Sequence, residues 1–132
     1  MSEVNAIHHL NFLVRDLNQS MGQMQAVLNR EPVLESLPQR QVKTARFDLN
    51  GTWLVLVQPL TADSAVGRIL ADRGEGLFLL SFGVDSLEAS LANLQQRGLQ
   101  ADGEPRQGLD NWRVCDLAVG SGLGPVLQLC QT

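Results

Sequence analysis

The feature that most constrains the fold of this chain is an internal repeat with an offset of 70 residues, from residue 9 to residue 79. Segment 9–17 (HLNFLVRDL) aligns with segment 79–87 (LLSFGVDSL), so that apolar positions of the first copy coincide with apolar positions of the second. The same offset places Met21 and Met24 on Leu91 and Leu94. Self-similarity over this length predicts two copies of one supersecondary unit.

Each copy begins with a strand pattern and continues with a helix pattern. The short apolar runs His9–Val14 and Leu77–Val84 are typical of strands. After each run, apolar residues recur at helical spacing from Leu17 and from Leu87. This spacing predicts a helix with one buried face directly after each strand.

Capping signals mark the second predicted helix and a shorter one before it. Asp85 is a candidate N-cap with Glu88 three positions later, as in a capping box, and Gly98 predicts the end of that helix. The joining segment Thr61–Gly76 contains a further predicted short helix over Ser64–Asp72.

Three extended stretches follow each of the two repeated helices. The turn Asn50-Gly51 predicts a hairpin in the first copy, and the glycine-rich turn Gly120–Gly124 predicts one in the second. Both halves therefore follow the order β-α-β-β-β, which predicts an α+β fold with one domain over residues 1–132. Its modules span about 5–60 and 75–131 and are joined by 61–74. The extended stretches are Pro32–Leu37, Val42–Leu49 and Thr52–Val57, then Leu99–Asp102, Trp112–Ala118 and Pro125–Cys130.

Composition excludes several classes of protein. An apolar fraction of 44% argues against disorder, and 10 basic against 14 acidic side chains argue against nucleic acid as a partner. No apolar run is long enough for a membrane span, and residues 1–5 lack a signal pattern, so we expect a cytoplasmic protein without a membrane partner. Two cysteines are too few for a disulfide framework or a cysteine-rich zinc site.

The tandem β-α-β-β-β arrangement resembles the vicinal oxygen chelate superfamily, which includes glyoxalases, extradiol dioxygenases, bleomycin resistance proteins and methylmalonyl-CoA epimerases. The amino-acid sequences of segments 7–17, 58–64 and 73–77 are most similar to those of the epimerase branch. The resemblance implies curved mixed sheets around a concave cavity, with helices outside. It also implies a homodimer.

Enzymes of this superfamily bind a divalent metal, which acts as a Lewis acid, through four strand residues. The corresponding positions here are His9, Val55, Leu79 and Gln128. Two of these are aliphatic, and one imidazole with one neutral amide is a poor donor set for a divalent cation. The resemblance thus implies that this chain binds no metal and no other cofactor. The carboxylate base of the epimerase branch corresponds to the neighbourhood of Gln39, an amide that cannot abstract a proton.

Strand alternation independently predicts which side chains line the concave face. That set is mostly apolar with a few polar groups, a composition typical of small-molecule sites. Trp53 either closes the cavity or offers a flat ring to an aromatic ligand. His9 is the candidate catalytic residue. The candidate ligand-binding residues are His9, Asn11, Trp53, Val55, Leu79, Ser81 and Gln128.

Two residue pairs could suggest a metal site or a redox site. Strand alternation argues against the first, and the lack of an activating group argues against the second. His8 and His9 are adjacent, so their side chains are expected on opposite faces of the strand, unable to share an ion. Cys115 and Cys130 fall on neighbouring predicted strands with nothing to activate a thiol, and a structural role is expected for both.

Three functions remain open from the sequence. The first is a glyoxalase/bleomycin-resistance-like protein that has lost the metal site and binds a small apolar or aromatic molecule, with Arg46 or Arg113 as a candidate partner for a ligand anion. The second is an isomerase or lyase of the methylmalonyl-CoA epimerase/glyoxalase type, in which His9 acts with Gln128 at an altered or metal-free site. The third is a dimeric interaction protein whose cavity is closed by its own side chains.

Overall fold

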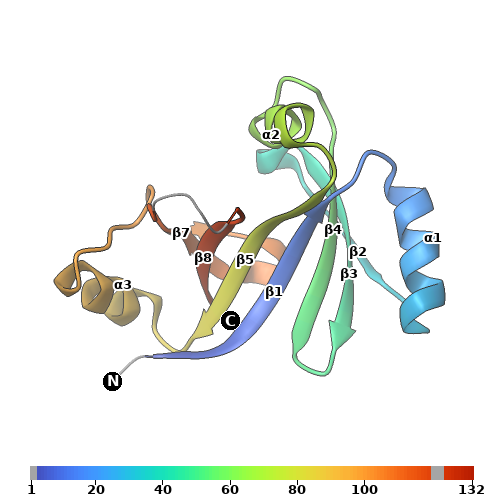
Figure 1. Cartoon of the computed structure of the whole chain (residues 1–132). Coiled ribbons are helices and arrows are strands. Elements are labelled where there is room, and N and C mark those ends of the chain that lie inside the picture. Colours follow the sequence, from blue (N-terminus) through green and yellow to red (C-terminus); the bar gives the residue numbers. More distant parts are fainter. Residues whose placement is uncertain (1–2, 120–123) are drawn as a thin grey trace. The chain divides into compact units, whose positions relative to one another are not determined.

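The computed structural model describes residues 3–119 and 124–132, so most of the predicted turn Gly120–Gly124 lies outside the described residues. The chain forms two compact units (Figure 1). The central unit is Leu10–Leu77, and the terminal unit combines the residues up to His9 with Phe78–Thr132. The elements are β1 Val4–Leu13, α1 Leu17–Leu28, β2 Val33–Leu37, β3 Val42–Leu49, β4 Thr52–Pro59, α2 Ala65–Arg73, β5 Gly76–Val84, α3 Leu87–Gln96, β6 Arg106–Gln107, β7 Arg113–Asp116 and β8 Val126–Gln131, with single 3-10 turns at Pro38–Arg40 and Leu109–Asn111.

The central unit has the strand order β2-β3-β4-β1, with β3 antiparallel to both β2 and β4. The predicted hairpin between β3 and β4 is confirmed: Asn50 and Gly51 both have positive φ, and the Gly51 amide donates to the Asp48 carboxylate. Helix α1 packs on one face of β3 and β4 (Figure 1). The core beneath it is fully apolar and consists of Val14, Leu17, Ala45, Phe47 and Leu56.

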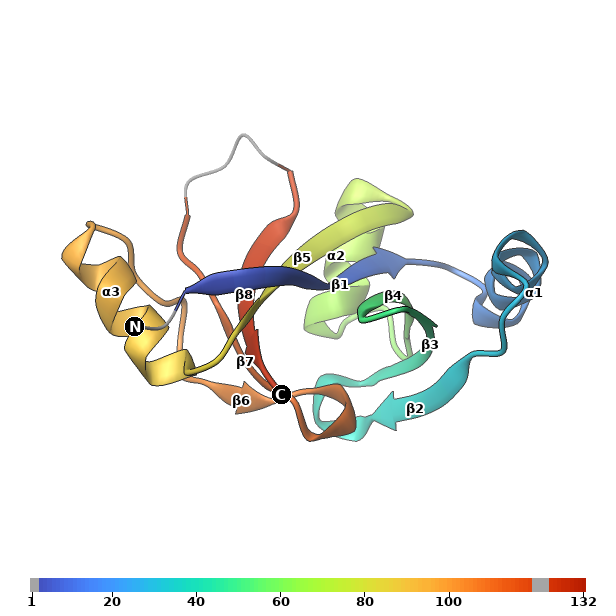
Figure 2. The same ribbon diagram turned by 90° about the horizontal axis from the view of Figure 1, so that it is seen from below.

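The terminal unit has the strand order β1-β5-β8-β7-β6, in which β5 and β8 run parallel and β7 is antiparallel to both of its neighbours. Helix α3 packs on β7 and β8 (Figure 2). The buried residues of this second core are Val84, Leu87, Cys115 and Leu129. The chain therefore has a mixed α+β fold, as the sequence predicts.

Both copies of the repeat contain an equivalent hydrogen bond that the sequence pattern does not predict. At the start of α1, the Leu17 amide donates to the side-chain oxygen of Gln58, which lies on β4. At the start of α3, the Leu87 amide donates to the side-chain oxygen of Gln131, on β8. In each copy a glutamine of the last strand thus satisfies a backbone donor in the first turn of the helix, which would otherwise lack a partner within the helix.

Two predictions about the second copy are wrong in detail. The N-cap of α3 is Ser86, which accepts from the Ala89 amide, whereas Asp85 accepts from the Asn5 side chain. The predicted strand Leu99–Asp102 contributes only an isolated bridge at Ala101, and β6 forms later. Positive φ at Gly98 ends the helix as predicted, and positive φ at Gly103 interrupts an extended run.

The short helix α2 forms in the joining segment as predicted. Its N-cap is Ser64, whose hydroxyl accepts from the Gly67 amide at 3.0 Å. A Cβ at Gly67 would clash with the backbone carbonyl oxygens of Thr61 and Ala62, so the close approach requires glycine. None of the helices in the described part of the chain is long and apolar enough to cross a membrane.

Candidate functional site

His9 lies in a group of rings in the terminal unit. Its side chain is only 3% exposed, and its ring stacks on Trp112 with the centroids 5.0 Å apart. The ring of His8 contacts the same indole edge-on at 4.5 Å, and the Nδ1 atoms of His8 and His9 are 2.9 Å apart. The expectation that the two imidazoles point to opposite faces, out of reach of each other, is therefore wrong, because both rings contact Trp112 and one another.

Burial keeps both imidazoles neutral. Desolvation, followed by the charge of the neighbouring His8, lowers the pKa of His9 to about 3, and the Gln128 amide offsets this in part. Desolvation also lowers the pKa of His8. A group with such a low pKa is a weak proton acceptor at pH 7, which limits what His9 can do as a general base.

Gln128 is held in place by an ion pair behind it. Its Nε2 donates to Asp116 Oδ1 at 2.9 Å, from the strand position directly opposite on β7. Asp116 in turn pairs with Arg106 at 3.3 Å. This chain of contacts fixes the orientation of the amide and leaves Gln128 Oε1 as the free acceptor.

Two buried polar side-chain atoms on the neighbouring strands β5 and β8 lack a hydrogen-bond partner among the described residues. They are Gln128 Oε1 and Ser81 Oγ, and the register of β5 and β8 sets Ser81 beside Gln128. Ser81 is fully buried and Gln128 is 3% exposed. An unpaired buried polar atom costs about 1–3 kcal/mol, so two together at one place are uncommon in a structural core.

The remaining predicted site residues divide between the two units. Leu79 lies on β5 in the terminal unit, two positions before Ser81, and is 5% exposed. Asn11, Trp53 and Val55 belong to the central unit. Val55 is fully buried, Trp53 is half-buried, and the Asn11 Oδ1 atom is buried without a partner among the described residues.

The four residues that the resemblance places at the metal positions of the superfamily form a poor donor set for a divalent cation. Val55 and Leu79 have hydrocarbon side chains, and Gln128 already donates to Asp116. One buried imidazole and one amide oxygen are the donor atoms that remain, and neither carries charge.

The two arginines considered for a ligand anion are each paired with a carboxylate. Arg46 is 5% exposed, lies 2.7 Å from Glu35 and stacks over the Trp53 ring at 5.3 Å. Arg113 lies 2.7 Å from Glu88 on the surface. Charge neutralisation by these partners makes either arginine a weak anion receptor.

Both cysteines are buried and free, but they lie on different faces of the sheet. Cys115 belongs to the core under α3, whereas Cys130 pairs with Val114 in register and faces the other way. Burial raises the pKa of Cys130 to about 12, so its thiol is protonated at pH 7. The ligating atoms of Cys130, His8 and His9 lie within 4.8 Å of one another. Sequence reasoning missed this cluster and the role of Trp112, because both depend on strand register.

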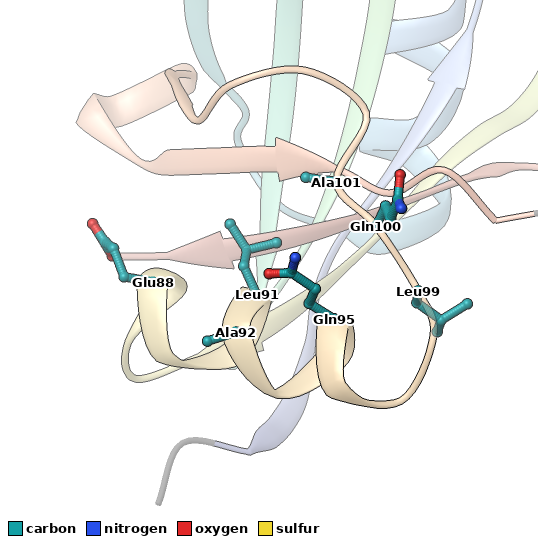
Figure 3. Close-up of a pocket in the computed structure, with 7 residues that line it drawn as sticks. All are labelled: Glu88, Leu91, Ala92, Gln95, Leu99, Gln100 and Ala101. Carbon is teal, nitrogen blue, oxygen red and sulfur yellow. The ribbon is translucent and has the colours of Figure 1, made fainter.

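A separate hollow of about 570 Å³ lies along α3, between the helix and the segment that follows it (Figure 3). Leu91 and Gln95 line it from the helix, and Leu99, Gln100 and Ala101 line it from the following segment. None of its lining residues is among the site residues predicted from the sequence.

Comparisons with known proteins agree with the fold. Residues 8–115 match the sequence profile of the Glyoxalase/Bleomycin resistance protein/Dioxygenase superfamily. The chain is 27% identical to the uncharacterized protein YqjC of Bacillus subtilis (strain 168) over 130 residues, which cover 97% of this chain and 93% of that protein. A variant of the Streptomyces coelicolor methylmalonyl-CoA epimerase in complex with 2-nitronate-propionyl-CoA is 26% identical with a TM-score of 0.91, covering 98% of this chain and 96% of that one.

The Mycobacterium tuberculosis methylmalonyl-CoA epimerase has the same fold, with a TM-score of 0.88 at 23% identity over 97% of this chain and 88% of that one. Together the matching profile and these folds define the class of protein. The chain belongs to the Glyoxalase/Bleomycin resistance protein/Dioxygenase superfamily. Its similarity to methylmalonyl-CoA epimerases agrees with the resemblance noted in the sequence.

Proposed function

We propose that this chain binds a small, mostly apolar molecule beside His9, without a divalent metal at the four positions that its superfamily uses. The observation that carries this proposal is the pair of buried, unpartnered atoms Ser81 Oγ and Gln128 Oε1. A ligand that satisfies both atoms regains the free energy that their burial costs in the unbound protein. The hydrocarbon side chain of Leu79, on the same strand as Ser81, supplies apolar surface nearby.

The donor and acceptor pattern specifies the polar end of the ligand. The Ser81 hydroxyl can donate, the Gln128 oxygen can only accept, and the His9 ring is neutral. Arg106, the cation in the chain of contacts behind Gln128, already pairs with Asp116. A neutral group that both donates and accepts, such as a carboxamide or an alcohol, therefore fits better than a carboxylate or a phosphate.

The second candidate is an isomerase or lyase, and the similarity to methylmalonyl-CoA epimerases favours it. In that case His9 with Gln128 would act on the substrate without a metal. The pKa of His9, lowered to about 3, opposes this mechanism because the ring accepts a proton poorly at neutral pH. We therefore place binding first. His9→Ala would abolish turnover if the protein is an enzyme and would only change affinity if it is a binding protein.

Ser81→Ala tests the binding proposal. We expect the variant to bind a neutral aromatic amide such as benzamide about tenfold more weakly than the wild type, which corresponds to the loss of one hydrogen bond. The free energy of unfolding without ligand should stay the same or rise by about 1 kcal/mol, because the substitution removes an unpaired buried hydroxyl. Tryptophan fluorescence titration and denaturant unfolding measure the two quantities.

The matched control is Ser90→Ala, which removes another buried serine hydroxyl from the same unit, on α3. This variant should bind benzamide like the wild type. Equal affinity of the wild type and Ser81→Ala for every neutral amide and alcohol tested would contradict the proposal. The proposal also states that no divalent metal binds at the four superfamily positions. Metal analysis after dialysis against Mn²⁺ and Co²⁺ tests this statement. One ion of either metal per chain would contradict it.

The superfamily resemblance also supports a homodimer as the working form of the protein. Light scattering behind size-exclusion chromatography measures the mass directly. A mass of twice 14.4 kDa is expected for the dimer, and a monomer at micromolar concentration would contradict this part of the proposal.

A further inference from the structure

Three side chains with nitrogen and sulfur donors converge in the terminal unit, and they form a donor set different from that of the superfamily. The ligating atoms of His8, His9 and Cys130 lie within 4.8 Å of one another. His9 and Cys130 are 3% and 1% exposed, and His8 is half-buried. Only His9 is shared with the four metal positions of the superfamily.

The atoms of this cluster are close to the spacing that a single ion requires. The two Nδ1 atoms are 2.9 Å apart. Two imidazole nitrogens bound to one ion at about 2.0–2.1 Å are separated by about 3.3–3.5 Å, so a shift of about half an ångström would admit the ion. Stacking of Trp112 on His9 and its edge contact with His8 hold both rings toward each other.

Donor softness and charge select the ion. Two imidazoles and one thiolate form a soft donor set that favours Cu⁺ or Zn²⁺ over Mn²⁺ or Mg²⁺. The thiolate supplies one negative charge, which cancels the charge of Cu⁺ but leaves a net positive charge with Zn²⁺. A net charge is unfavourable at a buried site, and the closest carboxylate behind Gln128, that of Asp116, is already paired with Arg106.

We propose that His8, His9 and Cys130 form a binding site for one monovalent soft metal ion, Cu⁺, with two imidazole nitrogens and one thiolate sulfur as ligands. In the metal-free protein one Nδ1 donates its proton to the other; on binding, that ring moves its proton to Nε2, so that both imidazoles present Nδ1 to the ion. The thiol proton of Cys130 leaves to solvent as the copper–sulfur bond forms, and no electron is transferred. This site shares His9 with the proposed ligand site but uses neither Ser81 nor Gln128.

The experiment is anaerobic titration of the reduced, full-length protein with Cu⁺ in competition with bicinchoninate. We expect about one Cu⁺ per chain, with an ultraviolet thiolate-to-copper absorption band and quenching of Trp112 fluorescence. Cys130→Ala should weaken the competition by about 100-fold or more and abolish the band, because it removes the only anionic ligand. His8→Ala, a truncation at a half-buried position, should weaken it by about tenfold or more.

The matched control is Cys115→Ala, which removes the other buried cysteine of the same unit. Its affinity for Cu⁺ should stay within about threefold of the wild type. The proposal is overturned if the wild type takes up no stoichiometric Cu⁺, if His8→Ala and Cys130→Ala both retain full affinity, or if Cys115→Ala loses as much affinity as Cys130→Ala. One equivalent of Zn²⁺ that resists displacement by Cu⁺ would overturn the charge argument.

Discussion

Burial of His9 predicts that this protein loses stability in mild acid, before most carboxylates titrate. The pKa of His9 is about 3 in the folded chain, against 6.5 for an unperturbed histidine. The unfolded chain therefore binds a proton below pH 6.5 that the folded chain does not bind. The sign follows directly: the stabilisation by neutral His9 is complete above about pH 6.5 and is lost progressively as the pH falls toward 3.

The magnitude follows from the same pKa values. Each pH unit below 6.5 removes about 1.4 kcal/mol, so the free energy of unfolding falls by about 2 kcal/mol between pH 6.5 and pH 5 through His9 alone. Urea unfolding of the wild type and His9→Gln at several pH values measures the effect. Only the pH dependence of the free energy of unfolding is compared between the wild type and His9→Gln. The cost of burying a glutamine does not depend on pH, so it does not affect this comparison.

His8→Gln serves as the matched variant. His8 is half-buried, so removing it should flatten the pH dependence much less than removing His9. Parallel stability curves for the wild type and His9→Gln between pH 6.5 and pH 5 would refute the reasoning. That result would mean that the folded protein protonates His9 as readily as the unfolded chain does.

Two further predictions concern contacts that the structure reveals. Ser86→Ala should lower the free energy of unfolding by about 1 kcal/mol through loss of the N-cap of α3, whereas Asp85→Ala should have the smaller effect, and thermal unfolding of both variants gives the order. A larger loss of stability in Asp85→Ala than in Ser86→Ala would instead support Asp85 as the N-cap, as the sequence predicts. Glu35→Gln should cost about 1.5–3 kcal/mol in urea unfolding, because it removes the charged partner of buried Arg46, and an unchanged midpoint would exclude a stabilising pair.

Elements with strong local periodicity are predictable from this sequence. Helix α1 forms over Leu17–Leu28 at the predicted spacing, and the Asn50-Gly51 hairpin joins β3 and β4 as expected. The strand predicted at Leu99–Asp102 fails because its local signal is weak. Glycines flank it, and the pairing that defines β6 is decided by the position of β7.

The candidate site is predictable only where it follows strand alternation. Ser81 and Gln128 were expected on one face, and the register of β5 and β8 sets them side by side. The His8 and His9 rings converge through contacts with each other and with Trp112, and hydrophobic periodicity in the sequence does not report such contacts. Trp112, which contacts both rings, comes from a segment about 100 residues away.

The sequence by itself determines that the chain is built from two copies of one β-α-β-β-β unit, because hydrophobic periodicity is a local property that each copy carries. The resemblance seen in the sequence also implies that two of the four metal positions of the superfamily lack donor atoms, because Val55 and Leu79 have hydrocarbon side chains. Tertiary structure alone decides which polar atoms lose their partners and which donors converge. Strand register and burial set the protonation of His9 and bring Cys130 to the two histidines, and both arise from contacts between segments far apart in the chain.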